Sequence, residues 1–93
     1  MRVRVLFYSF LRDLAGESEA WIDIPEGATL KQLIEEVGRK YGPDLGQAIK
    51  PQPGVDFSIL IYAGGQDYRF AGGEDMRLVD RMDAYFIPPA AGG

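Results

Sequence analysis

The side chains that usually carry out catalysis are scarce in this sequence. Its 93 residues include no Cys and no His. This excludes a thiolate nucleophile, a Cys-rich zinc site, a Ser-His-Asp triad and an imidazole metal ligand. Ser9, Ser18 and Ser58 have no base to activate their hydroxyl groups. The composition therefore argues against the common hydrolase, redox and metal-enzyme classes.

Two glycine pairs and one group of acids were considered as ligand sites and rejected. Gly64-Gly65 and Gly72-Gly73 lack the Lys-Ser or Lys-Thr of a phosphate-binding loop, so we interpret them as turn glycines. The acids that crowd the later part of the chain lack the regular spacing of a calcium-binding loop. These acids are Glu74, Asp75, Asp80 and Asp83. We expect no metal site.

The C-terminal segment is the remaining candidate for chemistry. Pro88-Pro89 should keep the chain extended as it leaves the last strand, because proline fixes φ and donates no backbone hydrogen bond. The residues that follow are all small: Ala90, Ala91, Gly92 and Gly93. Fully extended, this tail could project by up to roughly 20 Å at ~3.3–3.6 Å per residue. It could enter a narrow channel and present the α-carboxylate of Gly93 there; the alternative is a frayed end.

The elements that would carry this tail follow from the spacing of apolar residues. Val3, Val5 and Phe7 alternate with other residues, as in a strand with one face in a core. Similar segments predict strands at 20–24, 57–62, 67–70 and 84–87. A single helical turn is expected near residues 10–14, ending at Gly16.

One amphipathic helix is the clearest local feature. Thr29 followed by Gln32 predicts a capping box at its start, and Gly42-Pro43 predicts its end. Its apolar face would be formed by Leu30, Leu33, Ile34, Val37 and Tyr41. On the solvent side, the spacing predicts ion pairs from Glu35 to Arg39 and from Glu36 to Lys40.

Two further expectations concern glycine and proline in this region. Gly38 weakens the helix relative to alanine, so we expect it to mark a close backbone contact. Residues 43–56 contain three Pro and two Gly, which favours a long surface loop.

The order strand, strand, helix, strand, short strand, strand predicts an α+β fold. We expect a β-grasp arrangement, with a mixed five-stranded sheet and one main helix packed on one face. Its first and last strands would lie side by side and parallel. Residues 1–89 would form a single domain, and residues 90–93 a flexible Gly-Gly tail.

Charge and hydropathy narrow the range of partners. The formal net charge is −4, and the ten Lys and Arg residues form no basic run, so nucleic-acid binding is not expected. No apolar segment approaches the ~20 residues of a membrane helix. The first ten residues superficially resemble a signal peptide but lack a cleavage site. We expect a cytoplasmic protein.

Three segments carry a resemblance to a known family. They are VRVLFYSFLRDLAG near the N-terminus, IPEGATLKQLIEEV at the start of the helix, and the terminal FIPPAAGG. With them, the sequence resembles the ubiquitin-like sulfur carriers of the molybdopterin-synthase small subunit (MoaD) family and the related ThiS-like carriers. The resemblance covers essentially the whole chain, and its most specific part is the strand leading through Pro-Pro to Gly-Gly.

The resemblance implies a carrier protein, or a non-catalytic subunit of a sulfur-transfer complex, and not an enzyme. An E1-like enzyme would adenylate Gly93, and sulfur would then replace the AMP to give a thiocarboxylate. The carrier would pass this sulfur to a partner such as the large subunit of molybdopterin synthase. ATP and Mg²⁺ would belong to the activating enzyme, and this chain would bind no cofactor.

Departures from the family pattern leave the pathway open. The family commonly has Val-Asn-Gly after the third strand and Asp-Gly-Asp before the last. This chain has Tyr62-Ala63-Gly64 and Asp80-Arg81-Met82-Asp83 at these places. The stretch 67–73 resembles longer members, including archaeal small modifiers and carriers for cysteine synthesis, and argues against the shorter thiamine-type carriers. Alternatives are therefore a protein modifier conjugated through Gly93, a carrier for cysteine or thiamine biosynthesis, or an interaction domain with an inert tail.

Alternation also predicts a docking face. If Val3, Val5 and Phe7 face the helix, then Leu6 and Tyr8 point to the opposite side of the sheet. The resemblance adds Ile87 to that side, and alternation adds Tyr85, Leu60 and Tyr62. We expect an exposed apolar patch there that binds partner enzymes, together with Pro88, Pro89, Ala90 and Ala91 of the tail.

Overall fold

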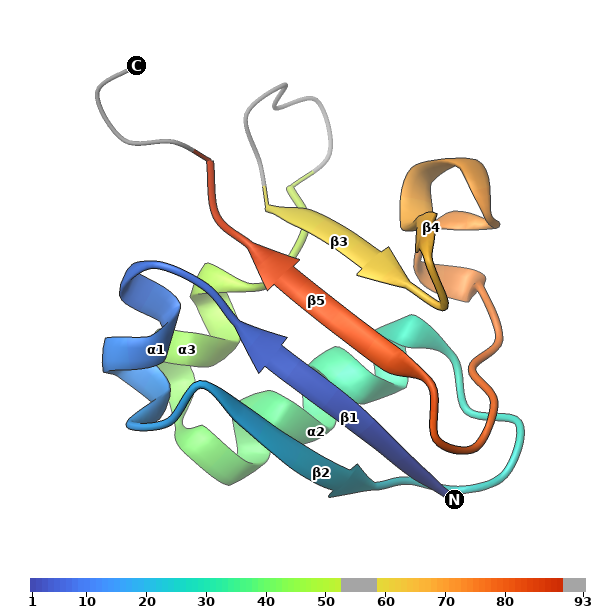
Figure 1. Ribbon diagram of the computed structural model, residues 1–93, viewed down its shortest axis with the longest axis horizontal. Coiled ribbons are helices and arrows are strands. Elements are labelled where there is room, and N and C mark those ends of the chain that lie inside the picture. Colours follow the sequence, from blue (N-terminus) through green and yellow to red (C-terminus); the bar gives the residue numbers. More distant parts are fainter. Residues whose placement is uncertain (53–58, 90–93) are drawn as a thin grey trace.

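The computed structural model describes residues 1–52 and 59–89. It confirms the predicted fold: a mixed five-stranded sheet with the main helix against one face (Figure 1). The strands are β1 (Arg2–Phe7), β2 (Glu19–Asp23), β3 (Leu60–Ala63), β4 (Gln66–Asp67) and β5 (Asp83–Ile87). The helices are α1 (Phe10–Ala15), α2 (Leu30–Tyr41) and α3 (Pro43–Ala48), with 3-10 turns η1 (Tyr68–Phe70) and η2 (Gly73–Asp75).

The sheet has the strand order β2-β1-β5-β3-β4. The first and last strands, β1 and β5, lie side by side and parallel, as predicted, and both β1–β2 and β5–β3 are antiparallel. One face of the sheet is packed against the helices. Val5 of β1, Phe86 of β5 and Ile61 of β3 are fully buried on that face. They pack with the α2 residues Leu30, Leu33, Ile34 and Val37 in one hydrophobic core.

Helix α2 begins and ends where its sequence predicts. The Thr29 side chain accepts a hydrogen bond from the Gln32 backbone N–H (3.4 Å), and Gln32 Oε1 accepts one from the Thr29 N–H (2.8 Å). This is the predicted capping box. The Leu30 N–H also bonds to the Met76 carbonyl (3.0 Å), which ties the start of the helix to the chain before β5. On its solvent side Arg39 pairs with Glu36, so the two predicted pairings are wrong in their partners.

Two predictions about irregular segments are wrong. Residues 43–48, expected in a loop, form α3, because Pro43 suits the first turn of a helix while Leu45 becomes buried. Residues 67–70, expected as a strand, end in η1 after a two-residue β4. There the Asp67 carboxylate accepts a hydrogen bond from the Arg69 N–H (3.0 Å), which closes a turn in place of a strand. Residues 57 and 58 of the predicted third strand lie outside the described residues.

Candidate docking face and tail exit

The chain leaves the sheet from its central strand. β5 lies between β1 and β3, and it ends at Ile87. Pro88 is buried and Pro89 is exposed, so Pro89 is the accessible proline at the exit. The predicted tail residues Ala90, Ala91, Gly92 and Gly93 lie outside the described residues.

The sheet face opposite the helices carries the predicted apolar residues. Tyr85 of β5 lies between Leu6 of β1 and Tyr62 of β3 in the strand register, and Ile87 lies opposite Leu60. The ring centroids of Tyr8 and Tyr85 are 6.0 Å apart. Tyr8 is 41% exposed and Tyr62 36%, while the other four are partly exposed. We call these six residues the apolar docking face: Leu6, Tyr8, Leu60, Tyr62, Tyr85 and Ile87.

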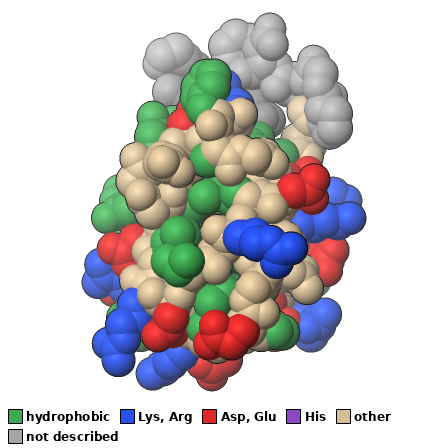
Figure 2. All heavy atoms as spheres, turned by 90° about the vertical axis from the view of Figure 1, so that its right-hand side faces the viewer, with side chains coloured by type: hydrophobic (Ala, Val, Ile, Leu, Met, Phe, Trp, Pro, Cys, Tyr) green, Lys and Arg blue, Asp and Glu red, His purple; other side chains and the backbone are tan. Residues whose placement is uncertain are grey.

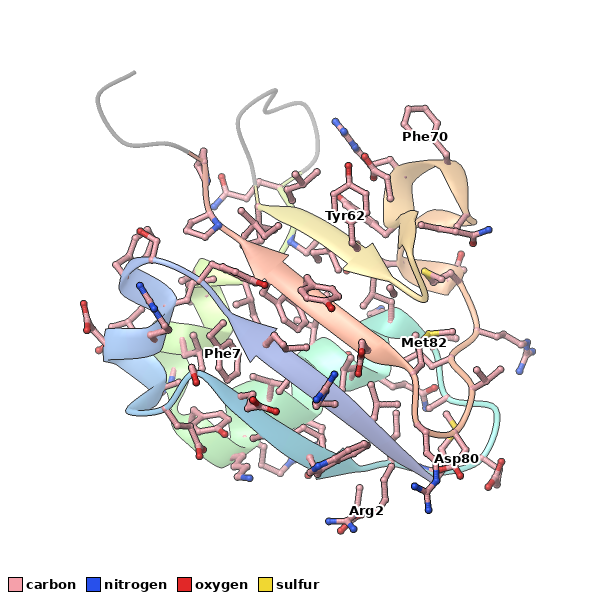
Figure 3. The ribbon with its side chains drawn as sticks, viewed as in Figure 1. Arg2, Phe7, Tyr62, Phe70, Asp80 and Met82 are labelled. Atoms are coloured by element: carbon pink, nitrogen blue, oxygen red, sulfur yellow. The ribbon has the colours of Figure 1, made fainter. Side chains whose placement is uncertain are left out.

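This docking face lies at the tail end of the sheet. Because β1 and β5 are parallel and β3 runs against them, Tyr8, Ile87 and Leu60 share the end at which the chain exits. In Figure 3, Arg2 and Asp80 lie at one end of the sheet and Tyr62 lies toward the other. A protein that covers the apolar docking face would therefore also stand next to the exit at Pro89.

The opposite end of the same face is charged. Arg4 binds Asp83 through two hydrogen bonds, from Nε (2.8 Å) and Nη2 (2.9 Å), and approaches Glu19 at 3.5 Å. The hydrogen bond from Arg4, together with its charge, holds the pKa of the Asp83 carboxyl below its usual range. The guanidinium groups of Arg2 and Arg4 lie 5.7 and 6.0 Å from the Trp21 ring centroid. The open face is thus divided into an apolar half and a charged half.

One exposed aromatic residue was missed by the sequence analysis. Phe70 in η1 is 87% exposed, with the Arg69 guanidinium 5.7 Å from its ring centroid. The predicted strand over 67–70 hid this, because alternation in a strand places Tyr68 and Phe70 on the same face. The turn buries Tyr68 and leaves Phe70 outside (Figure 3). The Asp67–Arg69 spacing is the sequence signal that could have identified the turn.

The described residues contain neither a cluster of metal-ligating side chains nor a membrane-spanning helix. Within residues 1–52 and 59–89, no three acidic side chains lie close enough together to hold a metal ion. Two of the acids considered above have other partners: Asp83 binds Arg4, and Asp80 accepts a hydrogen bond from the Arg2 N–H (2.9 Å). No helix in this part of the chain is long and apolar enough to cross a bilayer.

Comparison with known proteins connects this geometry to a family. No protein-family model matches the sequence, and no curated protein matches it either. Solved structures do match. The putative molybdopterin converting factor subunit 1 of Pyrococcus furiosus has a TM-score of 0.80 and 25% identity, covering 97% of this chain and 99% of that one.

Two further neighbours agree over nearly the whole chain. CysO in the BexX/CysO complex of Amycolatopsis orientalis has a TM-score of 0.78 and 27% identity, with 98% of this chain and 99% of that chain covered. The small archaeal modifier protein 1 of Methanosarcina acetivorans has a TM-score of 0.78 and 26% identity, with 99% and 96% covered.

The chain is a β-grasp, ubiquitin-like protein. Its neighbours are a putative molybdopterin converting factor subunit 1, a CysO and a small archaeal modifier, and this likeness confirms the resemblance seen in the sequence. Their folds are those of small carriers and modifiers, which is consistent with a non-catalytic role.

Proposed function

We propose that this chain is a sulfur carrier that donates sulfur in molybdopterin biosynthesis. The observation that carries the proposal is the fold, which matches a putative molybdopterin converting factor subunit 1 over 97% of this chain. The position of the apolar docking face beside the chain exit supports it, because an enzyme bound to that face would stand where the tail emerges.

The reacting group would be the α-carboxylate of Gly93, with Gly92 giving access to it. A carboxylate is a poor acyl donor, so it first attacks the α-phosphate of ATP, releasing pyrophosphate and forming an acyl adenylate. Hydrosulfide then attacks the acyl carbon, and the bond to AMP breaks, which releases AMP and leaves a thiocarboxylate. ATP and Mg²⁺ belong to the activating enzyme, and this chain supplies only the acyl group.

Two kinds of partner protein follow from this scheme. One is an E1-like adenylating enzyme, and the other is a sulfur-accepting enzyme of the molybdopterin-synthase large-subunit type. Both would contact the apolar docking face in turn. We place the protein in the cytoplasm, where ATP for the activation is available.

The decisive experiment is the intact mass of the chain after incubation with its activating enzyme, ATP and a sulfur donor. We expect one oxygen to be exchanged for sulfur at Gly93. Deleting Gly93, or adding a C-terminal tag, should abolish both this exchange and ATP–pyrophosphate exchange. The melting temperature should be unchanged, because the buried core described above is formed by residues between Val3 and Phe86.

Matched variants sharpen this test. Gly93→Ala and Gly92→Ala should fold normally but be activated poorly, because a Cβ obstructs a narrow channel. A substitution away from the tail, Gln47→Ala, should be activated normally. Normal pyrophosphate exchange by the tagged protein would refute activation at Gly93.

A protein modifier is the second candidate, and one comparison favours it. The chain is 26% identical to a small archaeal modifier protein 1 over nearly its full length. The same activated Gly93 would then form isopeptide bonds with lysine side chains. Conjugates recovered from cells and mapped to lysines would support this role. A carrier role in cysteine synthesis is a further alternative, suggested by the CysO neighbour, and it would require sulfur transfer to the acceptor of that pathway.

A further inference from the structure

The outer edge of β2 is a second place where this chain could bind another protein. β2 is the first strand in the sheet order, and only β1 pairs with it among the strands that the structure describes. Figure 1 shows β2 along the margin of the sheet, with α2 behind it. An edge strand presents unpaired N–H and C=O groups that another strand can use.

The hydrogen-bond pattern shows which groups point outward. Met1 and Ile24 exchange backbone hydrogen bonds (2.8 and 2.9 Å), and the Phe7 N–H bonds to the Ser18 carbonyl (2.8 Å). Antiparallel pairs alternate, so the pairs between these two, Val3–Ile22 and Val5–Ala20, also face inward. The backbone groups of Glu19, Trp21 and Asp23 therefore point to the outer edge.

A groove runs along this edge. It has a volume of about 220 Å³, and it lies between β2 and the solvent side of α2. Trp21, Ile22 and Asp23 line it from the strand, and Glu36 and Lys40 line it from the helix. The groove thus provides room for the side chains of an added strand on the helix side of the sheet.

The charges on the edge strand argue against pairing between two copies of this chain. In an antiparallel pair centred on Trp21, each Glu19 would lie opposite an Asp23, and like charges directly opposite destabilise a sheet. Both carboxylates are accessible: the Glu19 side chain is 53% exposed and the Asp23 side chain 83%. Glu19 is only weakly compensated, since Arg4 binds mainly to Asp83, and Asp23 pairs with Arg2 at 3.2 Å while most of its side chain stays exposed.

We propose that the outer edge of β2 binds an extended basic segment of a partner protein as an added antiparallel strand. The first and fifth residues of such a segment would be cationic, opposite Asp23 and Glu19. The third would be apolar, opposite Trp21, and the second and fourth would face the groove. The backbone supplies the affinity, and the two acids select the sequence. This site does not depend on the proposed sulfur chemistry.

The experiment is a titration of the full chain with the peptide acetyl-Lys-Val-Val-Val-Lys-amide, followed by amide NMR. We expect shifts concentrated at residues 19–23 and at Glu36 and Lys40. The matched peptide with Glu in place of both Lys should bind about tenfold more weakly. Methylating the central peptide nitrogen removes the donor to the Trp21 carbonyl and should weaken binding by up to about tenfold.

A protein variant tests the same hydrogen bonds from the other side. Trp21→Pro removes an outward N–H that β1 does not use, so an edge strand should tolerate it. Compared with Trp21→Ala, which loses the ring but keeps the N–H, it should bind the basic peptide several-fold more weakly. If Trp21→Pro fails to fold, the methylated peptide still tests whether the added strand uses the outward backbone groups of Trp21. Equal binding of the basic and acidic peptides, no effect of methylation, or a dimer whose amide shifts map to β2 would overturn the proposal.

Discussion

At the scale of single residues, several polar contacts surround the start of β5. Arg81 has φ 65°, a left-handed conformation that glycine adopts most readily. Its N–H bonds to the Arg2 carbonyl (2.7 Å), and the Arg2 N–H bonds to the Asp80 carboxylate (2.9 Å). Asp83, the first residue of β5, then pairs with Arg4 of β1. These contacts fix the register of β5 against β1, and this register places Tyr85 and Ile87 on the open face.

The Arg4–Asp83 pair makes stability depend on pH in the acid range. The folded chain lowers the Asp83 pKa, so the unfolded chain binds a proton more readily as the pH falls. The stabilisation that this pair provides is therefore complete above the ordinary aspartate pKa of about 3.9, and it is lost progressively as the pH falls below that value. We expect the melting temperature to fall below about pH 4, and less steeply in Asp83→Asn. Glu35→Gln, which removes an exposed acid from α2, is the control; identical pH profiles for wild type and Asp83→Asn would contradict this.

At the scale of elements, α2 and α3 approach each other through two glycines. A Cβ on Gly46 would lie 3.1 Å from the Gly38 Cα, and a Cβ on Gly38 would lie 3.3 Å from the Gly46 Cα. Both distances are shorter than ordinary packing contacts, and both involve helix backbone. The approach lets Leu45 of α3 be almost completely buried beside Val37 of α2 in one core.

This contact reverses the usual effect of replacing glycine in a helix. Alanine at an exposed helix position gains about 1 kcal/mol over glycine. In Gly46→Ala the new methyl group would instead push α3 away from α2, so we expect a net loss on the order of 1 kcal/mol. Chemical denaturation measures it, with Gln47→Ala as the control in the same helix. A variant more stable than wild type would show that the two helices can separate freely.

The same elements show what the sequence could and could not predict. Strands β1, β2 and β5 and helix α2 were predictable because each has a regular apolar period with a clear start and stop. The close contact at Gly38 was predicted from a glycine that propensity alone would disfavour. Helix α3 was not predicted, because the prolines and glycines in 43–56 outweighed the helical spacing of Leu45 and Ile49, both of which are buried. The prediction for residues 67–70 failed because one hydrogen bond, which the Asp67 carboxylate accepts from the Arg69 N–H, forms a turn there.

The predicted docking residues depend on alternation, so the register of β1, β5 and β3 was enough to place all six on one face. Phe70 could not be placed in this way, because a 3-10 turn has no two-residue period. The ion pairs on α2 were mispredicted by one residue, since Arg39 can reach Glu36 as well as Glu35. Sequence patterns thus predicted which face a side chain occupies better than which partner it contacts.

At the scale of the whole molecule, the two faces of the sheet differ in what covers them. One is covered by helices, and the other is open, with its apolar half at the tail exit and its charged half at the far end. Around the side that carries β4, acidic and basic side chains are intermixed over the lower part of the surface (Figure 2). A partner drawn to apolar surface would therefore bind near Tyr8 and Ile87, next to the place where β5 ends.

This division leads to a test of the apolar docking face with charged substitutions. Tyr8 is 41% exposed and Ile87 is partly exposed, so Tyr8→Asp and Ile87→Asp should leave the domain folded. In a complex, each would bury a carboxylate against apolar surface, which should weaken binding to the activating enzyme by at least ~2 kcal/mol, within the range of interface hot spots. Val79→Asp provides the matched control, because Val79 is 59% exposed and lies in the segment before β5, outside the docking face.

Calorimetric titration with the activating enzyme measures the loss, and melting curves check the fold of each variant. The control should bind like wild type, which separates a local effect from the added negative charge. If Tyr8→Asp and Ile87→Asp both unfold, the residues belong to the core and the open face is not a docking surface. If both fold and bind normally, the partner does not approach this side of the sheet, and the tail must be reached from another direction.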